Sequence, residues 1–257
     1  MLRFFKFHQR CFPPVPARDV YFKPGKGKGW PEECPPIRTA NAFGFDLLAN
    51  FDLDFRFRSG TGPMSGWKLH NPITLESDFG WAPTDDAEAT PLTQDYAWFW
   101  KKGQKLPHVI SDNVYDVIRH QVKVSSFLYL QTDPGEILLL TEVPNTRTPW
   151  RAITALIETD WYPASYPWHC VLELNPAHKR IFIPKGTPLC RLIPLKRDNY
   201  LAKTMTPRQF NTFFEKGQAW LRTHGKPHAE GAASSTLDIT RTYSRQQKKC
   251  PFHVQNP

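Results

Sequence analysis

The sequence predicts an all-β protein, a single barrel or sandwich of short strands followed by one helix. Proline is abundant, with 25 residues against 14 glycines, which disfavours long helices and coiled coils. Short apolar runs separated by turn residues fill the middle of the chain. With 257 residues, 40% of them hydrophobic, the chain can bury a full core, and no stretch approaches the roughly 18 apolar residues of a membrane helix.

The N-terminal residues 1–37 are predicted to form an extended, proline-rich arm on the surface. The β core is expected over residues 38–200 and begins with an alternating segment. From Phe45 to Phe57 every odd position is apolar, and five of the six even positions are polar. Such alternation places one face of a strand on the core and the other toward water. Because thirteen residues exceed the usual strand, we expect a bend near Ala49 and Asn50.

Residues 59–107 are rich in glycine, proline and aromatic residues and are expected to form a loop-rich insertion. Its tryptophans either line a pocket or anchor the insertion to the core. They are Trp67, Trp81, Trp98 and Trp100. Six strand-like runs follow: Val122–Leu130, Glu136–Thr141, Ile153–Ile157, His169–Leu174, Arg180–Ile183 and Leu189–Leu195.

A helix is predicted in residues 201–225. Thr206 and Gln209 match a capping box, Pro207 suits the first helical position, and Gly225 ends the pattern. Phe210, Phe213 and Phe214 recur at helical spacing, so we expect a packing helix. Residues 226–257 are basic and without periodicity, which predicts a tail that is ordered only by contact.

The distribution of charge and the cysteine content limit the kinds of binding partner that we expect. The net charge is +9, but residues 1–30 hold seven basic residues against one acid, and residues 200–257 hold nine against three. Because the excess lies in the two ends, nucleic acid is not an expected partner, and neither is a membrane. The five cysteines form no C-x-x-C pair, which indicates reduced thiols and a cytoplasmic location and argues against a zinc ribbon.

The candidate site follows the apolar run that ends at Ile157. On a strand, Glu158 and Asp160 share a face, and Thr159 points the other way. Two close carboxylates share a proton, activate a water or bind Mg²⁺, so at least one of them should have a raised pKa. We assign Glu158 as general base and Asp160 as its metal or hydroxyl partner. Trp161 supplies a stacking plane, and Asn145 is expected close by.

A structural alternative has solvated acids at a strand end and a Trp that closes the barrel. The histidines carry little signal, because His108, His120 and His169 lack the spacing of a metal site. No metal ligand is therefore assigned, and Mg²⁺ is the one cofactor that the carboxylates suggest.

Two stretches resemble the dUTPase and dCTP deaminase superfamily. Residues 42–47, which include Asp46, are similar to its Ala-Gly-Tyr-Asp-Leu motif, and residues 152–162 are similar to its third motif. The resemblance implies a β-clip fold, a homo-oligomer, in particular a trimer, and a nucleotide site that includes Asp46 and Arg191. Arg191 stands where the superfamily has a Gln, and Val143-Pro144-Asn145 replaces its phosphate-binding Arg-Ser-Ser, which disfavours dUTP hydrolysis.

The pattern over residues 38–197 also resembles an uncharacterised bacterial and phage protein family. The matching pieces are Ala40-Asn41 with Gly44-Phe45, Asp133-Pro134-Gly135, Pro144-Asn145, Glu158-Thr159-Asp160-Trp161 and Lys185-Gly186-Thr187-Pro188. This resemblance implies no activity. From their residue type, Asn41 and Asn145 are candidate ligand-orienting amides; the alternative is that each bonds to the backbone of its turn, as Asn beside a turn usually does.

Together these observations favour a protein that binds a nucleotide or similar polar small molecule at the Glu-x-Asp-Trp site. Whether it also hydrolyses that molecule, and so is an enzyme, stays open at this point. Two alternatives remain: a structural or assembly protein with docking arms, and a metal-dependent, oxygenase-like β-sandwich.

Overall fold

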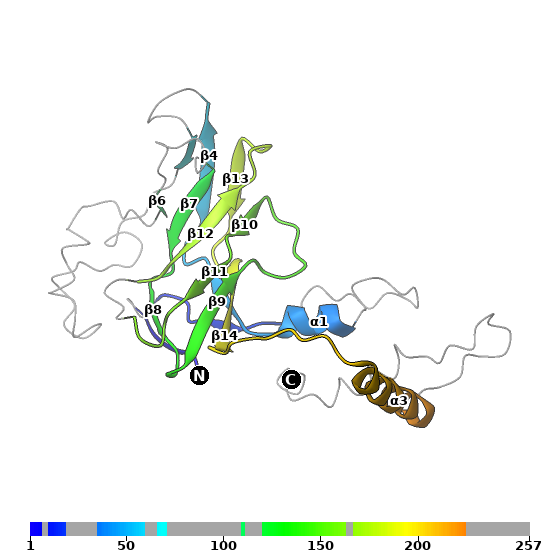
Figure 1. Cartoon of the computed structure of the whole chain (residues 1–257). Helices are drawn as coiled ribbons and strands as arrows, with labels where there is room; N and C mark the ends of the chain where they lie inside the picture. Colours follow the sequence, from blue (N-terminus) through cyan, green and yellow to red (C-terminus); the bar gives the residue numbers. More distant parts are fainter. Residues whose placement is uncertain are drawn as a thin grey trace. The chain divides into compact units, whose positions relative to one another are not determined.

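The computed structural model describes residues 1–6, 10–18, 35–59, 66–70, 109–110, 120–162 and 167–224 (Figure 1). The chain divides into two compact units. The first joins Met1–Ala17 to Gly44–Arg197 and contains all the described strands, and the second contains the two described helices. The predicted sites at Trp81, Trp98, Trp100 and His108, and the tail at 226–257, lie outside the described residues.

The described chain is mostly β, as predicted. The strands are β1 (Arg3–Lys6), β2 (Val15–Pro16), β3 (Phe45–Leu48), β4 (Leu53–Arg58), β5 (Gly66–Leu69), β6 (Val109–Ile110), β7 (Gln121–Ser125), β8 (Leu128–Gln131), β9 (Glu136–Thr141), β10 (Trp150–Ala152), β11 (Ala155–Ile157), β12 (His169–Leu174), β13 (Arg180–Ile183) and β14 (Pro188–Lys196). Strands β9, β12 and β13 have the predicted bounds.

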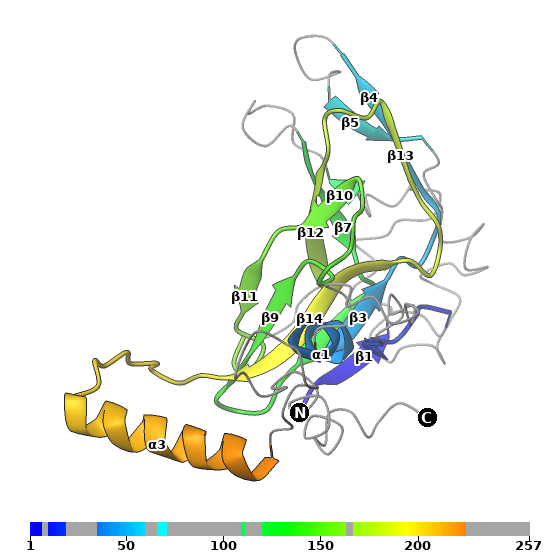
Figure 2. The ribbon, with the colours of Figure 1, turned by 90° about the vertical axis from the view of Figure 1, so that its right-hand side faces the viewer.

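These strands form four open antiparallel sheets rather than a closed barrel (Figure 2). The largest has the order β11-β9-β14-β3-β2, and the next has the order β10-β12-β7-β6. A three-stranded sheet, β13-β4-β5, and the pair β1-β8 complete the unit. Their inner faces share one hydrophobic core, in which Phe55, Trp67, Leu138 and Leu172 have no exposed surface.

The segment from Phe45 to Phe57 is broken as predicted, because β3 ends at Leu48 and β4 begins at Leu53. Its odd positions reach the core, and Leu53 is 2% exposed. The prediction that the even positions face water is wrong for Asp46, Asn50 and Asp54, which are buried. Each of these three polar side chains has a hydrogen-bond partner: Arg191 for Asp46, Arg180 for Asp54, and the backbone of Ser126 for Asn50.

The predicted strand Val122–Leu130 is two strands, because Phe127 adopts a φ of 55° between β7 and β8. Hydroxyl groups stabilise this break: Ser125 accepts from the Phe127 amide at 3.2 Å, and Ser126 accepts from the Leu128 amide at 3.2 Å. The Phe127 ring is fully buried and packs edge-on against Phe51, with 5.7 Å between ring centroids. Local propensity favours one strand here, and core packing produces two.

The N-terminal residues add strands to the core. β1 pairs with β8, and β2 pairs with β3 at the edge of the five-stranded sheet. Backbone hydrogen bonding thus ties residues 1–17 to the first unit, which includes them.

The second unit contains α1 (Pro35–Ala42) and α3 (Pro207–His224). α1 crosses the predicted boundary at residue 37, whereas α3 begins at its capping box, where the Gln209 amide donates to the Thr206 hydroxyl at 3.3 Å. The expected packing of α3 through its phenylalanines is not found, since Phe210, Phe213 and Phe214 are 51%, 61% and 52% exposed. Neither of the described helices has the length and apolar character to cross a membrane.

Candidate functional site

The Glu158–Trp161 segment lies in a turn that directly follows β11. The strand ends at Ile157, and the turn closes where the Tyr162 amide donates to the Glu158 carbonyl at 3.0 Å. Thr159 is buried, and its hydroxyl lies 2.8 Å from that of Thr132. The two carboxylates therefore reach one side as expected, but a turn anchored by Thr159, rather than strand alternation, places them there.

Arg197 clamps both carboxylates. Its guanidinium donates to Glu158 Oε1 at 3.0 Å, to Glu158 Oε2 at 2.8 Å and to Asp160 Oδ1 at 2.8 Å. Arg197 directly follows β14, and its amide donates to the Gly135 carbonyl at 2.8 Å. The Gly135 amide in turn donates to Asp160 Oδ2 at 3.3 Å. The last residue of the first unit is thus fixed to both the acids and the Asp133–Gly135 turn.

The clamp reverses the expected titration of the acids. The hydrogen bond from Arg197, and then that from the Trp161 indole, lower the pKa of Glu158. Burial raises the pKa of Asp160, but the hydrogen bond and charge of Arg197 outweigh it, and the pKa is lowered. The prediction of a raised carboxyl pKa is therefore wrong. Both groups are ionised at neutral pH, and carboxylates held in this way are weak general bases.

Replacing Arg197 with glutamine should raise the pKa of both Glu158 and Asp160, because it removes their shared cation. A carboxyl group whose pKa is lower in the folded than in the unfolded protein stabilises the fold at pH values above its unfolded pKa. This stabilisation is lost as the pH falls below about 4 and the group becomes protonated. We expect the urea midpoint of the variant to change less between neutral pH and pH 3 than that of the wild type. Carboxyl ¹³C NMR titration measures each group.

Trp161→Phe is the matched control, since its indole donates only to Glu158 among the two acids. It should raise the pKa of Glu158 and leave that of Asp160 unchanged. Unaltered titration of both acids in the Arg197 variant would contradict the clamp.

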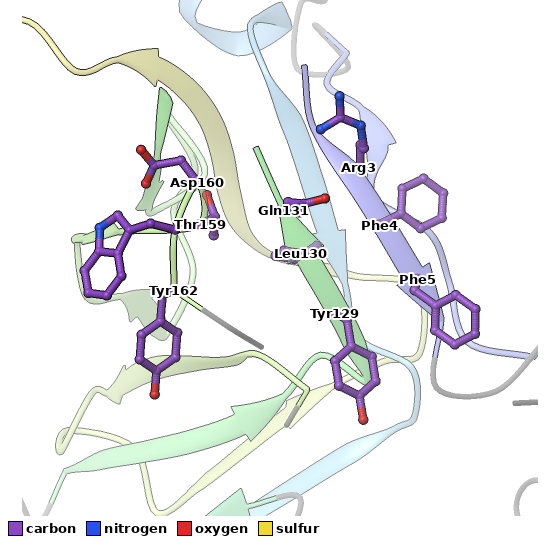
Figure 3. A pocket seen from close by; sticks show the side chains of 10 residues that line it. Arg3, Phe4, Phe5, Tyr129, Leu130, Gln131, Thr159, Asp160 and Tyr162 are labelled. Carbon is purple, nitrogen blue, oxygen red and sulfur yellow. The ribbon is translucent and has the colours of Figure 1, made fainter. Parts of the chain in front are cut away.

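A pocket of about 400 Å³ lies beside the turn (Figure 3). One wall comes from the paired strands β1 and β8, and the other comes from the segment after β11. Tyr129 and Tyr162 stand on opposite walls, with their hydroxyl groups directed the same way. The lining residues are Arg3, Phe4, Phe5, Tyr129, Leu130, Gln131, Thr159, Asp160, Trp161 and Tyr162.

Aromatic rings dominate the exposed part of this pocket. Trp161 is 65% exposed and meets the Tyr162 ring edge-on, with 5.9 Å between centroids. On the opposite wall, the rings of the paired residues Phe5 and Tyr129 lie 6.4 Å apart between centroids. The charges on the lining are paired: Asp160 with Arg197, and Arg3 with Asp133 at 2.5 Å. The pocket therefore offers ring faces and hydrogen-bonding groups rather than an uncompensated charge.

Asn145 is not at this site, so the expectation of its proximity is wrong. β11 runs antiparallel to β9, with Ala155 opposite Leu140 and Ile157 opposite Leu138. The loop with Asn145 follows the C-terminal end of β9. The acids follow the C-terminal end of β11, which lies beside the N-terminal half of β9 because the two strands are antiparallel. The loop and the acids lie at opposite ends of a six-residue strand, on the order of 20 Å apart. Asn145 instead takes a φ of 59° in its turn.

Asp46 and Arg191 face each other across β3 and β14, away from the acids. The Arg191 Nε donates to Asp46 Oδ1 at 2.6 Å, and Arg191 is 1% exposed. Burial raises the pKa of Asp46, and the hydrogen bond and charge of Arg191 oppose it. The pair lies in the sheet interior and does not line the pocket. Asn41 is buried on α1 in the second unit.

Sequence reasoning missed Arg197, Tyr129, Tyr162 and Gln131. Tyr162 directly follows the Glu-x-Asp-Trp motif and could have been included with it. Arg197 carries no local signal, because only the pairing of β14 with β9 brings it to the acids. The same is true of Tyr129 and Gln131, which are placed by the pairing of β8 with β1.

Within the described parts of the chain no three His, Cys, Asp or Glu side chains cluster to hold a metal ion. At the candidate site, the single guanidinium of Arg197 is bonded to both Glu158 and Asp160. His169 is partly buried, and this burial lowers its pKa, while the His120 ring accepts a hydrogen bond from the Trp67 indole at 3.2 Å.

The sequence matches no protein-family model and no curated protein. Among solved structures, the chain is similar to dUTPase from phage phi11 of S. aureus, with a TM-score of 0.34 and 8% identity over 80% of this chain and 96% of that chain. It is also similar to Staphylococcus bacteriophage 80alpha dUTPase with dUPNHPP, with a TM-score of 0.36 and 8% identity over 80% of this chain and 88% of that chain. Similarity at this level carries no conclusion about this chain.

Proposed function

We propose that the chain binds a nucleoside or nucleotide in the pocket between β1–β8 and Thr159–Tyr162. The observation that carries the proposal is the presence of aromatic rings on both walls, with Tyr129 on one wall and Tyr162 on the other (Figure 3). A nucleobase presents two flat faces to such rings, and each base stacked on an aromatic side chain contributes about 1–3 kcal/mol. The volume of about 400 Å³ falls in the range of small-molecule sites.

The polar groups at the rim suit the rest of such a ligand. The exposed Gln131 carboxamide both donates and accepts hydrogen bonds, as the polar edge of a base requires. Arg3 is the cation of the lining, and its side chain is 51% exposed, so a phosphate at the mouth can contact it beside its ion pair with Asp133. The carboxylate of Asp160 is 8% exposed and satisfied by Arg197, so it does not repel a phosphate strongly.

The proposal is for binding, not hydrolysis. A hydrolytic role for Glu158 or Asp160 requires Arg197 to leave them, because both carboxylates have lowered pKa values while it is bound. The oxygenase alternative finds no cluster of metal ligands among the described residues. The assembly alternative predicts that no small molecule binds the pocket, and the following experiment therefore separates it from ours.

Isothermal titration calorimetry with nucleosides, and with mono- and triphosphates of each base, tests the proposal. Tyr162→Ala should weaken binding of the preferred ligand about fivefold or more, because a stacking contact is lost. Tyr200→Ala is the matched control: Tyr200 is 80% exposed, does not line the pocket, and should leave the affinity unchanged. Absence of binding at millimolar concentration, or equal affinity of wild type and the Tyr162 variant, would overturn the proposal.

A further inference from the structure

The strands β13, β4 and β5 form one three-stranded sheet (Figure 2), and its register brings basic residues to one face. The strand register places Arg180 opposite Arg56, and Arg56 opposite Lys68, so three cations form a row across the sheet. Arg58 lies two residues beyond Arg56 and shares its face. We call these four residues, together with Phe182, the basic sheet face.

Strand alternation shows that this is the outer face. The residues between these cations, Phe55, Trp67 and Ile181, are at most 1% exposed and belong to the core. By contrast, the side chains of Arg56 and Arg180 are 46% and 59% exposed. The row of cations therefore lies on the side of the sheet that faces away from the core.

Asp54 fixes two of the cations in place. It is 5% exposed and accepts from Arg180 Nε at 2.7 Å, from Arg180 NH2 at 3.2 Å and from Arg56 NH2 at 3.1 Å. The hydrogen bond from Arg180 lowers the pKa of Asp54, which therefore stays ionised. It is the only acid within these three strands. The guanidinium groups are thus oriented before any partner arrives.

Phe182 adds an apolar ring to the same face. It lies opposite Asp54 in the register and is 46% exposed. The Arg180 guanidinium carbon lies 5.9 Å from the ring centroid. A cationic surface that displays an aromatic ring is typical of single-strand recognition, in which phosphates meet Lys and Arg and a base stacks on the ring.

We propose that the basic sheet face binds single-stranded nucleic acid, with phosphates on Arg56, Arg58, Lys68 and Arg180 and one base on Phe182. A single strand fits better than a duplex, because bases in a duplex already stack on one another and cannot stack on Phe182. A lipid headgroup would use the cations but not a stacking ring. The expectation from overall charge did not include this partner, because it considered segments rather than faces.

Fluorescence anisotropy with labelled oligothymidylate and oligouridylate over a salt series tests the proposal. Three or four phosphate contacts give a slope of log affinity against log salt of about −2 to −2.8, so four contacts imply roughly 50-fold weaker binding at about 200 mM than at about 50 mM salt. Arg58→Gln with Lys68→Gln should reduce the slope by about 1.4. Phe182→Ala should weaken binding about fivefold or more.

The matched control is Lys123→Gln with Lys196→Gln, which removes two exposed cations from other sheets and should leave affinity and slope almost unchanged. Tyr162→Ala should also leave oligonucleotide binding unchanged, so this test is independent of the nucleotide pocket. Equal losses in the two double variants would overturn the proposal. The proposal would also be overturned if a duplex or an anionic vesicle bound as tightly as the single strand and if Phe182→Ala had no effect on binding.

Discussion

Replacing Arg191 with methionine is expected to destabilise the protein by about 3–5 kcal/mol, because it leaves Asp46 buried without its cation. The two residues face each other in the register of β3 and β14, with 2.6 Å between Arg191 Nε and Asp46 Oδ1. A domain of this kind has a total stability of about 5–15 kcal/mol, so the loss is a large share of it. Urea denaturation at neutral pH measures the change.

The control is the double variant Asp46→Leu with Arg191→Met, which replaces both charges with apolar groups. A well-packed apolar pair in place of a buried ion pair is often neutral or stabilising, so the double variant should recover most of the lost stability. The raised pKa of Asp46 is consistent with a carboxylate whose burial is unfavourable without Arg191. A double variant less stable than Arg191→Met would show that the pair stabilises the fold beyond charge compensation.

Replacing Gly44 with alanine is expected to cost about 2–5 kcal/mol, the sum of backbone strain and overpacking. Gly44 has a φ of 91°, and an added Cβ would lie 2.5 Å from the Leu192 carbonyl oxygen and 2.9 Å from a side-chain carbon of Ile193. Because the first of these atoms is backbone, β14 itself would have to move away from the chain that leads into β3.

Gly135→Ala separates the two contributions. Gly135 also has a positive φ, 79°, but nothing lies within 4 Å of an added Cβ. This variant should lose only the backbone term, about 1–2 kcal/mol, as measured by the same urea denaturation. Equal losses at the two glycines would mean that the close approach of β14 to Gly44 has no energetic effect.

The candidate site was predictable only as a sequence motif. Glu158, Asp160 and Trp161 are adjacent in the chain, and their residue types alone indicated a polar site beside an aromatic ring. Their protonation depends on Arg197, which lies 37 residues from Asp160 along the chain and reaches it through the pairing of β14 with β9. Residue type suggested a base, whereas the neighbouring cation makes the pair a fixed, ionised structural element.

The basic surface, like the candidate site, depends on tertiary structure more than on local sequence. The segment between the two basic ends has more acidic than basic residues, yet the basic sheet face lies within it. Segment sums cannot detect such a surface, because Arg56, Lys68 and Arg180 come from three strands and meet only through register. Asp54, an acid of the same segment, pairs with Arg180.

The sequence by itself determined the β class, the bounds of β9, β12 and β13, the break after Leu48, and the start of α3. These depend on alternation, proline and capping, which act over a few residues. The tertiary structure alone decided that Asp46 and Asp54 are buried, that Asn145 lies away from the acids, and that Tyr129 and Tyr162 line the same pocket. The physical reason is that burial, electrostatic pairing and pocket shape depend on which strands are neighbours, and backbone pairing sets that choice over separations of more than a hundred residues.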